Sequence, residues 1–318
     1  MRSKEQMPRF EFLESRLLLS GNVTAVITGS GDLLIVGDSG DNAIDITVDG
    51  GGQISVAAGG DASTTVNDGA DPVLLDGLTG NVILQMKDGN DVVTITGLTI
   101  SGSLRFDGAR GDNTLTVDST SVGGKLSVKN LRGDQSFTLR NASSVGGNLT
   151  VKTAQRGNTD TTVSDATITG KLQVNNKDGT DTASLTDTTV GRSVQINNHK
   201  GDSVTTIDGA TIGRNLFLKS MKGADSLDVL NGTTVALKTK LVTGDSGADI
   251  DLLGLTTAKL QIQTGKGDDQ VGLDGVTVTQ QTQIHTGKGN DTLTVASALS
   301  PTDFGGPVKL DLGHGNDT

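Results

Sequence analysis

The sequence of 318 residues contains no cysteine, tryptophan or tyrosine, and only four prolines. Without cysteine, the chain can form neither a disulfide framework nor a thiolate metal site. Its only aromatic residues are six phenylalanines, so a core has to be built from valine, isoleucine, leucine, alanine and threonine. The lack of tryptophan and tyrosine also leaves sugar binding by ring stacking without support. These absences favour a narrow core of small branched side chains.

Long hydrophobic runs and an excess of positive charge are also absent. No apolar run approaches the roughly 20 residues that a membrane-spanning helix needs, so we expect no membrane span. The net charge is −11, with 37 acidic and 26 basic residues. Because nucleic acids and anionic lipids require a basic surface, we expect no nucleic-acid partner.

Glycine, in contrast, is abundant, and from Gly89 onward it recurs with a period near 22 residues. A fixed spacing in this range is typical of a solenoid, in which each unit buries its apolar face against its neighbours. The recurring glycines are Gly89, Gly111, Gly133, Gly157, Gly179, Gly201, Gly223, Gly247, Gly267, Gly289 and Gly315.

Apolar residues follow each glycine in a fixed pattern, as in Val93, Ile95, Ile100, Leu104 and Phe106. Pairs at i and i+2 with a polar residue between them indicate strands with one buried face. Each repeat therefore predicts two strands and a short third one. Because parallel crossovers are almost always right-handed, we expect an all-β fold, a right-handed parallel β-helix (β-solenoid) with about 22 residues per coil.

The repeat also divides the chain. We expect an export-associated leader over residues 1–22, irregular N-terminal coils or a cap over residues 23–80, and a regular β-solenoid over residues 81–318. The sequence ends at the opening of a further repeat, which indicates truncation at the C-terminus and an uncapped end open to self-association. Ile250 and Leu252 are one residue out of phase, which predicts a local kink.

The turns at the later glycines carry candidate metal ligands. Three of them read Gly-x-Gly-x-Asp and resemble half of the haemolysin-type calcium-binding repeat, Gly-Gly-x-Gly-x-Asp-x-apolar-x. The resemblance implies that these turns coordinate Ca²⁺ between neighbouring coils. The chain departs from that family because it offers one acidic turn per 22 residues instead of two turns per 18. The candidate calcium ligands are Asp268, Asp269, Asn290, Asp291, Asn316 and Asp317.

Two alternatives need no metal. A basic residue precedes many of the glycines, as at Arg110, Lys200 and Lys266, and a row of such residues could offset the stacked carboxylates. Alternatively, aspartate, asparagine and glycine stand there because tight turns favour them.

The N-terminal stretch Arg9–Ser20 does not follow the repeat. It resembles the Leu-Glu-Pro-Arg-x-Leu-Leu motif near the start of many surface or secreted proteins of planctomycete bacteria, with Ser15 in place of the proline. Its apolar run is too short for an ordinary signal peptide. The resemblance implies an exported protein, extracellular or at the cell surface.

Catalysis finds little support in the sequence. Each coil carries much the same charges, and none stands out by a long loop, an aromatic pair or a histidine with acidic neighbours. We therefore expect a non-catalytic structural or adhesive β-solenoid whose partners are cell-surface or matrix components. The alternative is a carbohydrate-active β-helix enzyme of the polysaccharide lyase or hydrolase type, which a groove with a carboxylate cluster confined to a few coils would favour.

Overall fold

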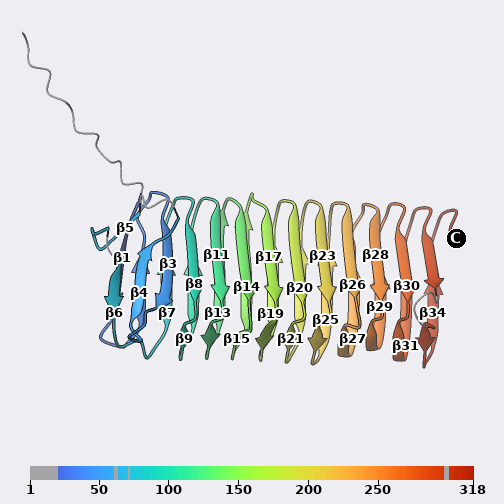
Figure 1. The fold of residues 1–318 in the computed structure, drawn as a ribbon. Helices are drawn as coiled ribbons and strands as arrows, with labels where there is room; N and C mark the ends of the chain where they lie inside the picture. Colours follow the sequence, from blue (N-terminus) through green and yellow to red (C-terminus); the bar gives the residue numbers. More distant parts are fainter. Residues whose placement is uncertain (1–20, 61–63, 71, 297–300) are drawn as a thin grey trace, which may run out of the picture.

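The computed structural model describes residues 21–60, 64–70, 72–296 and 301–318. These residues form an all-β parallel β-solenoid of about 10 turns, with about 22 residues per turn, and contain no helix. The coils stack side by side into a rod, with the first strands at one end and the C-terminus at the other (Figure 1). The predicted fold class is confirmed.

Two sheets form the walls of the rod, and we call them sheet I and sheet II. Sheet I consists of β3 (Ala43–Val48), β4 (Ile54–Ala58), β6 (Val73–Leu75), β8 (Val92–Thr96), β11 (Asn113–Asp118), β14 (Gln135–Arg140), β17 (Thr159–Ser164), β20 (Asp181–Thr186), β23 (Ser203–Asp208), β26 (Asp225–Leu230), β28 (Ala248–Leu253), β30 (Gln270–Asp274) and β32 (Thr292–Ala296).

Sheet II receives a short and a long strand from most coils, and in β27, β29 and β31 the two are continuous. It consists of β1 (Gly21–Ile27), β2 (Leu33–Val36), β5 (Thr64–Val66), β7 (Val82–Gln85), β9 (Thr99–Ile100), β10 (Leu104–Asp107), β12 (Ser121–Val122), β13 (Leu126–Arg132), β15 (Ser143–Val145), β16 (Leu149–Gln155), β18 (Ala166–Ile168), β19 (Leu172–Asn176), β21 (Thr189–Val190), β22 (Val194–Asn198), β24 (Thr211–Ile212), β25 (Asn215–Ser220), β27 (Thr234–Val242), β29 (Thr256–Gln263), β31 (Thr277–His285), β33 (Asp303–Phe304) and β34 (Val308–Asp311).

The alternation seen in the sequence positions the core. In β11, Leu115 and Val117 are fully buried, and they pair in register with Phe137 and Leu139 of β14. The short strands at Ile100, Val122 and their equivalents add a third row of buried side chains. Each coil thus buries its apolar residues against those of the next coil, and one continuous core runs along the rod.

The length variations between coils lie at the corners. Thr138 of β14 pairs with Thr162, and Val128 of β13 pairs with Val151, so the two-residue insertion between Gly133 and Gly157 leaves both walls in register. The predicted kink near Ile250 is wrong. Ile250 and Leu252 are buried and pair with Leu227 and Val229, because the one-residue shift is absorbed before Ala248. Irregular register occurs instead in sheet II, between Val235 and Lys238 of β27 and in its pairing partner β29.

The N-terminal part differs from the regular coils. Strands β1 and β2 pair antiparallel, as do β3 with β4 and β4 with β6. From β8 to β32, every pairing in sheet I is parallel. Most of the predicted leader, including Arg9–Ser20, lies outside the described residues. Nowhere in the described chain is there a helix suited to crossing a bilayer.

Candidate functional site

The turn glycines determine how the candidate metal ligands are placed. Gly267 and Gly289 have φ values of 103° and 135°, in the region that favours glycine. A Cβ atom on Gly289 would collide with the carbonyl oxygen of Gly267 in the preceding coil. The turns therefore stack at close approach, and the two residues after each glycine form two columns along the rod.

The first column, which we call the outer ladder, is formed by the residue directly after each turn glycine. The backbone N–H of Asn290 donates to Asp268 Oδ1 at 2.7 Å, and the N–H of Asn316 donates to Asn290 Oδ1 at 3.0 Å. The same bond joins Asp112 to Asn90 and Asp134 to Asp112, each at 2.8 Å. In the outer ladder, each side chain thus accepts a bond from the coil that follows it.

The second column, the inner ladder, is formed by the next residue, whose side chain is buried at Asp269 and Asp291 and half-buried at Asp317. Here the bond runs the other way, because the backbone donor lies in the preceding coil. The N–H of Ala248 donates to Asp269 Oδ1 at 2.8 Å, that of Asp269 to Asp291 Oδ1 at 3.0 Å, and that of Asp291 to Asp317 Oδ1 at 2.9 Å. The two opposed ladders bind each turn to the coil before it and the coil after it.

The six candidate calcium ligands thus lie in two columns, with at least one polar contact for each. Asp268, Asp269, Asn290 and Asp291 each have an Oδ1 atom that already accepts a backbone N–H. Calcium takes about 6–8 oxygen ligands, and no group of three or more aspartate, glutamate or histidine side chains suited to a metal ion occurs among the described residues. Backbone N–H donors thus already contact oxygens that the sequence assigned to a metal or to a row of basic side chains.

The second oxygen of five inner-ladder carboxylates lies in an unusual environment. The Oδ2 atoms are buried and have no hydrogen-bond partner in the described structure. At Asp225 the contrast is clear, because Oδ1 accepts bonds from Ser203 Oγ at 2.7 Å and Ser220 Oγ at 2.6 Å. The carboxylates with such an Oδ2 atom are Asp91, Asp181, Asp225, Asp269 and Asp291.

Burial changes the acidity of Asp91, Asp181 and Asp269. Burial raises the pKa of Asp91 to about 7, against the bonds donated by Asn42. Burial likewise raises the pKa of Asp181 to about 6 and that of Asp269 to about 6, and the charge of Asp291 adds to the shift at Asp269. Since desolvation disfavours the charged form, these side chains bind protons more readily than free aspartate.

The basic residues before the turn glycines form only exposed pairs. Arg110 Nη1 lies 3.3 Å from Asp88 Oδ2, and Lys266 Nζ lies 3.1 Å from Asp245 Oδ2. All four side chains are at least half exposed. Such pairs contribute little to stability, so the ladders dominate the turn.

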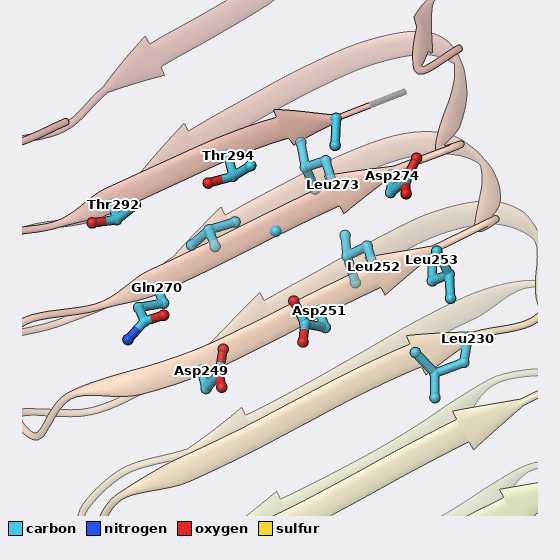
Figure 2. Close-up of a pocket in the computed structure, with 13 residues that line it drawn as sticks. Leu230, Asp249, Asp251, Leu252, Leu253, Gln270, Leu273, Asp274, Thr292 and Thr294 are labelled. Carbon is cyan, nitrogen blue, oxygen red and sulfur yellow. The ribbon is translucent and has the colours of Figure 1, made fainter. Parts of the chain in front are cut away.

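A separate feature, the acidic groove, lies on the outer face of sheet I. It has a volume of about 440 Å³ and crosses β28, β30 and β32. Asp249 and Asp251 extend from one strand, and Asp274 lies at the far end of the next (Figure 2). Gly272 has no side chain, and a Cβ atom there would lie 2.5 Å from Asp251 Oδ1, so the carboxylate occupies that space.

The carboxylates in and beside the groove are close enough to interact with one another. Burial raises the pKa of Asp251, and the charge of Asp249 raises it further. Burial also raises the pKa of neighbouring Asp228, with contributions from Asp251 and Asp249. The residues that line the groove include no lysine, arginine, histidine or aromatic side chain. A carboxyl group that stays protonated beside an ionised one can act as a general acid.

Sequence reasoning missed this groove, although a signal exists. The positions of Asp228 and Asp251 are occupied in earlier coils by Thr116, Thr138 and Thr206. An alignment of the outward-facing positions, instead of the buried ones, shows that the coils with Asp228 and Asp251 differ from the earlier coils. The expectation that each coil carries much the same charges is therefore wrong for the coils of β26 and β28.

One histidine also has an acidic neighbour, contrary to expectation. His285 Nδ1 lies 3.3 Å from Asp311 Oδ2 across adjacent strands of sheet II, and both side chains are about half exposed. Such a pair is an ionic contact only when the imidazole is protonated.

No family model, no curated protein and no solved structure matches the chain.

Proposed function

We propose that this chain is a non-catalytic, exported structural or adhesive β-solenoid. The observation that carries the proposal is the repetition of one inter-coil arrangement along the rod. From β8 to β32 each sheet I strand meets its neighbour in parallel register, and the turn ladders recur in most coils. A rod of this kind presents long polar walls for attachment.

Export is supported by the N-terminal resemblance to planctomycete surface proteins. A composition without cysteine and an acidic surface are compatible with that location. Calcium stabilisation belongs to the proposal only as a secondary element, because the ladder oxygens already accept backbone donors.

Surface labelling of intact cells that produce the protein tests the proposal. We expect an antibody to label the cells and external protease to remove the signal, while a cytoplasmic marker stays intact. A signal that appears only after lysis would overturn export. Cells in which the gene is deleted serve as the control for antibody specificity.

The acidic groove favours a second candidate, a carbohydrate-active hydrolase or lyase. Two carboxylates in different environments are the usual machinery of glycoside hydrolysis. Incubation with polysaccharides and measurement of new reducing ends or unsaturated products tests it. Under our proposal no product forms, whereas product formation that is lost in Asp251→Asn and kept in Asp112→Asn would establish the enzyme.

A further inference from the structure

The lysines of this acidic chain are unevenly distributed, and four of them gather on sheet II. Lys219 lies on β25, Lys238 and Lys240 on β27, and Lys259 on β29. These three strands are neighbours in the C-terminal half of the rod (Figure 1). Lys238 pairs directly with Lys259 in the strand register. The acidic groove lies on the other sheet, so the two walls carry opposite charge at these levels.

These four lysines have no carboxylate partner in the described part of the chain. Among the ion pairs of the described residues, none includes Lys219, Lys238, Lys240 or Lys259. Lys238 Nζ instead donates to the amide oxygen of Gln261 at 2.7 Å. Burial, followed by the charges of Lys240 and Lys259, lowers the pKa of Lys238. Like charges held together without a counterion attract an anion from solution.

An outward-facing phenylalanine lies inside this cluster. Phe106 and Phe137 are fully buried in the core, whereas Phe217 is partly exposed on the outer face of β25. It pairs with Lys240 across the strands, and Lys219 pairs with Val242. The four residues therefore form a block in which apolar and cationic side chains alternate.

Amide side chains border the block on both sides. Gln195 and Asn197 of β22 pair with Phe217 and Lys219, and Gln261 and Gln263 of β29 pair with Lys240 and Val242. A hollow of about 400 Å³ opens here. We call this area the sheet II patch, and it consists of Gln195, Asn197, Phe217, Lys219, Lys240, Val242, Gln261 and Gln263, with Lys238 and Lys259 at its edge.

We propose that the sheet II patch binds an anionic polysaccharide, one that bears carboxylate or sulfate groups, as the ligand of the adhesive function proposed above. Phe217 would receive the apolar face of a sugar ring, the lysines its acidic groups, and the amides its hydroxyls. A polymer along the rod axis meets a new strand about every 4.8 Å, so neighbouring sugars reach the amides on either side.

The surroundings of the patch favour a glycan over other polyanions. Amide side chains offer both donors and acceptors, which suits hydroxyl groups, whereas phosphate accepts hydrogen bonds only. The overall charge of −11 opposes the approach of a densely charged nucleic acid or an anionic membrane. The local lysine cluster suffices for a polymer with one charge per sugar.

Calorimetric titration of the full chain at low salt tests the inference. The probes are polygalacturonate, with a carboxylate on each sugar, and iota-carrageenan, with a sulfate on each sugar. Uncharged dextran and single-stranded DNA are the comparisons. We expect one or both acidic polysaccharides to bind, dextran not to bind, and DNA to bind more weakly. Added salt should weaken binding because the contact is exposed. No binding to either acidic polysaccharide, or tighter binding to DNA, would overturn the inference.

Variants locate the contact. Phe217→Ala and the double variant Lys219→Gln/Lys240→Gln should each weaken binding about tenfold or more, which corresponds to about 1.4 kcal/mol. Lys152→Gln, in the same row of sheet II but several coils away, should bind within about twofold of the parent. Circular dichroism checks that each variant folds. Binding unchanged in both patch variants would show that the polymer binds elsewhere.

This outcome is separate from that of the proposed function. A protein at the cell surface that binds neither polysaccharide contradicts only the ligand. A protein that binds them but stays inside the cell contradicts export and leaves the patch assignment standing.

Discussion

Asp269 and Asp291, in successive coils, are joined by a hydrogen bond from the backbone N–H of Asp269 to Asp291 Oδ1 at 3.0 Å. Both side chains are buried, and the Oδ2 atom of each has no partner in the described structure. In Asp291, one carboxylate oxygen thus accepts a favourable hydrogen bond, while the other is buried without a partner, which is unfavourable. The acidic turn is stabilised by backbone donors but carries a cost when its carboxylates are charged.

Stability should therefore decrease as the pH rises from about 4 to about 7. The pKa of Asp91 is raised to about 7 and those of Asp181 and Asp269 to about 6. A raised pKa means that the folded chain binds the proton more tightly than the unfolded chain. Protonation therefore stabilises the fold at pH values below these pKa values. This stabilisation is lost as the pH rises through them. Melting curves at pH 5 and pH 8 should show the higher midpoint at pH 5.

Asp91→Asn should weaken that pH dependence and raise the midpoint at pH 8. Asn113 already occupies the same ladder position, where its Oδ1 accepts the N–H of Asp91 at 3.1 Å. The amide can therefore keep the ladder bond without the charge. Each unit of pKa shift corresponds to about 1.4 kcal/mol. Asp112→Asn, in the exposed outer ladder, is the control, and an equal effect from both variants would contradict this account.

Gly111→Ala should destabilise the rod far more than Gly232→Ala. Both glycines have positive φ, 114° and 74°. A Cβ on Gly111 would collide with Gly89 O, whereas one on Gly232 meets no atom within 4 Å. We expect a loss of about 1 kcal/mol at Gly232 from backbone strain alone, and about 3 kcal/mol or more at Gly111. Urea titration measures both, and similar midpoints would show that the turns do not stack tightly.

Asn130→Ala should cost about 1–3 kcal/mol, because a fully buried side chain that bonds to two successive turns would be lost. Asn130 Nδ2 donates to Gly111 O at 3.1 Å and to Gly133 O at 3.3 Å, and Oδ1 accepts from Asn113 Nδ2. Asn175→Ala, on the outer face of sheet II, is a matched control with a smaller expected loss. Thermal melts that rank the two variants in the opposite order would contradict the role of the buried corner.

Removal of calcium should leave the fold intact. The ladder oxygens of Asp268, Asp269 and Asp291 already accept backbone N–H groups, so the turns do not require the ion as a bridge. We expect the same β-sheet circular dichroism with EDTA as with added calcium. Loss of that signal in EDTA, restored by calcium but not by magnesium, would instead assign these residues as ligands.

The architecture was predictable because burial leaves a periodic trace. Leu115 and Val117 alternate with threonine in the sequence, and they are buried as expected. The kink predicted at Ile250 and Leu252 was wrong because the number of residues from the preceding glycine does not show where an extra residue lies. It can lie within the strand or in the turn before it. The pairing of these two residues with Leu227 and Val229 shows that it lies in the turn.

The site was less predictable, because it depends on which atoms meet between coils. Sequence spacing placed Asp268 and Asp269 in one turn, but it could not show that their hydrogen bonds run in opposite directions. The sheet II patch was missed for another reason. Phe217 stands between the buried residues Leu216 and Leu218, so its outward direction follows only from the register of the strand.

The opposed ladders have a mechanical consequence. A force along the axis passes through every junction between coils in series, so the weakest junction limits the load. At each laddered corner, two side-chain bonds resist separation in addition to the strand pairing. A fibre built this way gains reach with each added level, while its tensile strength stays that of a single junction.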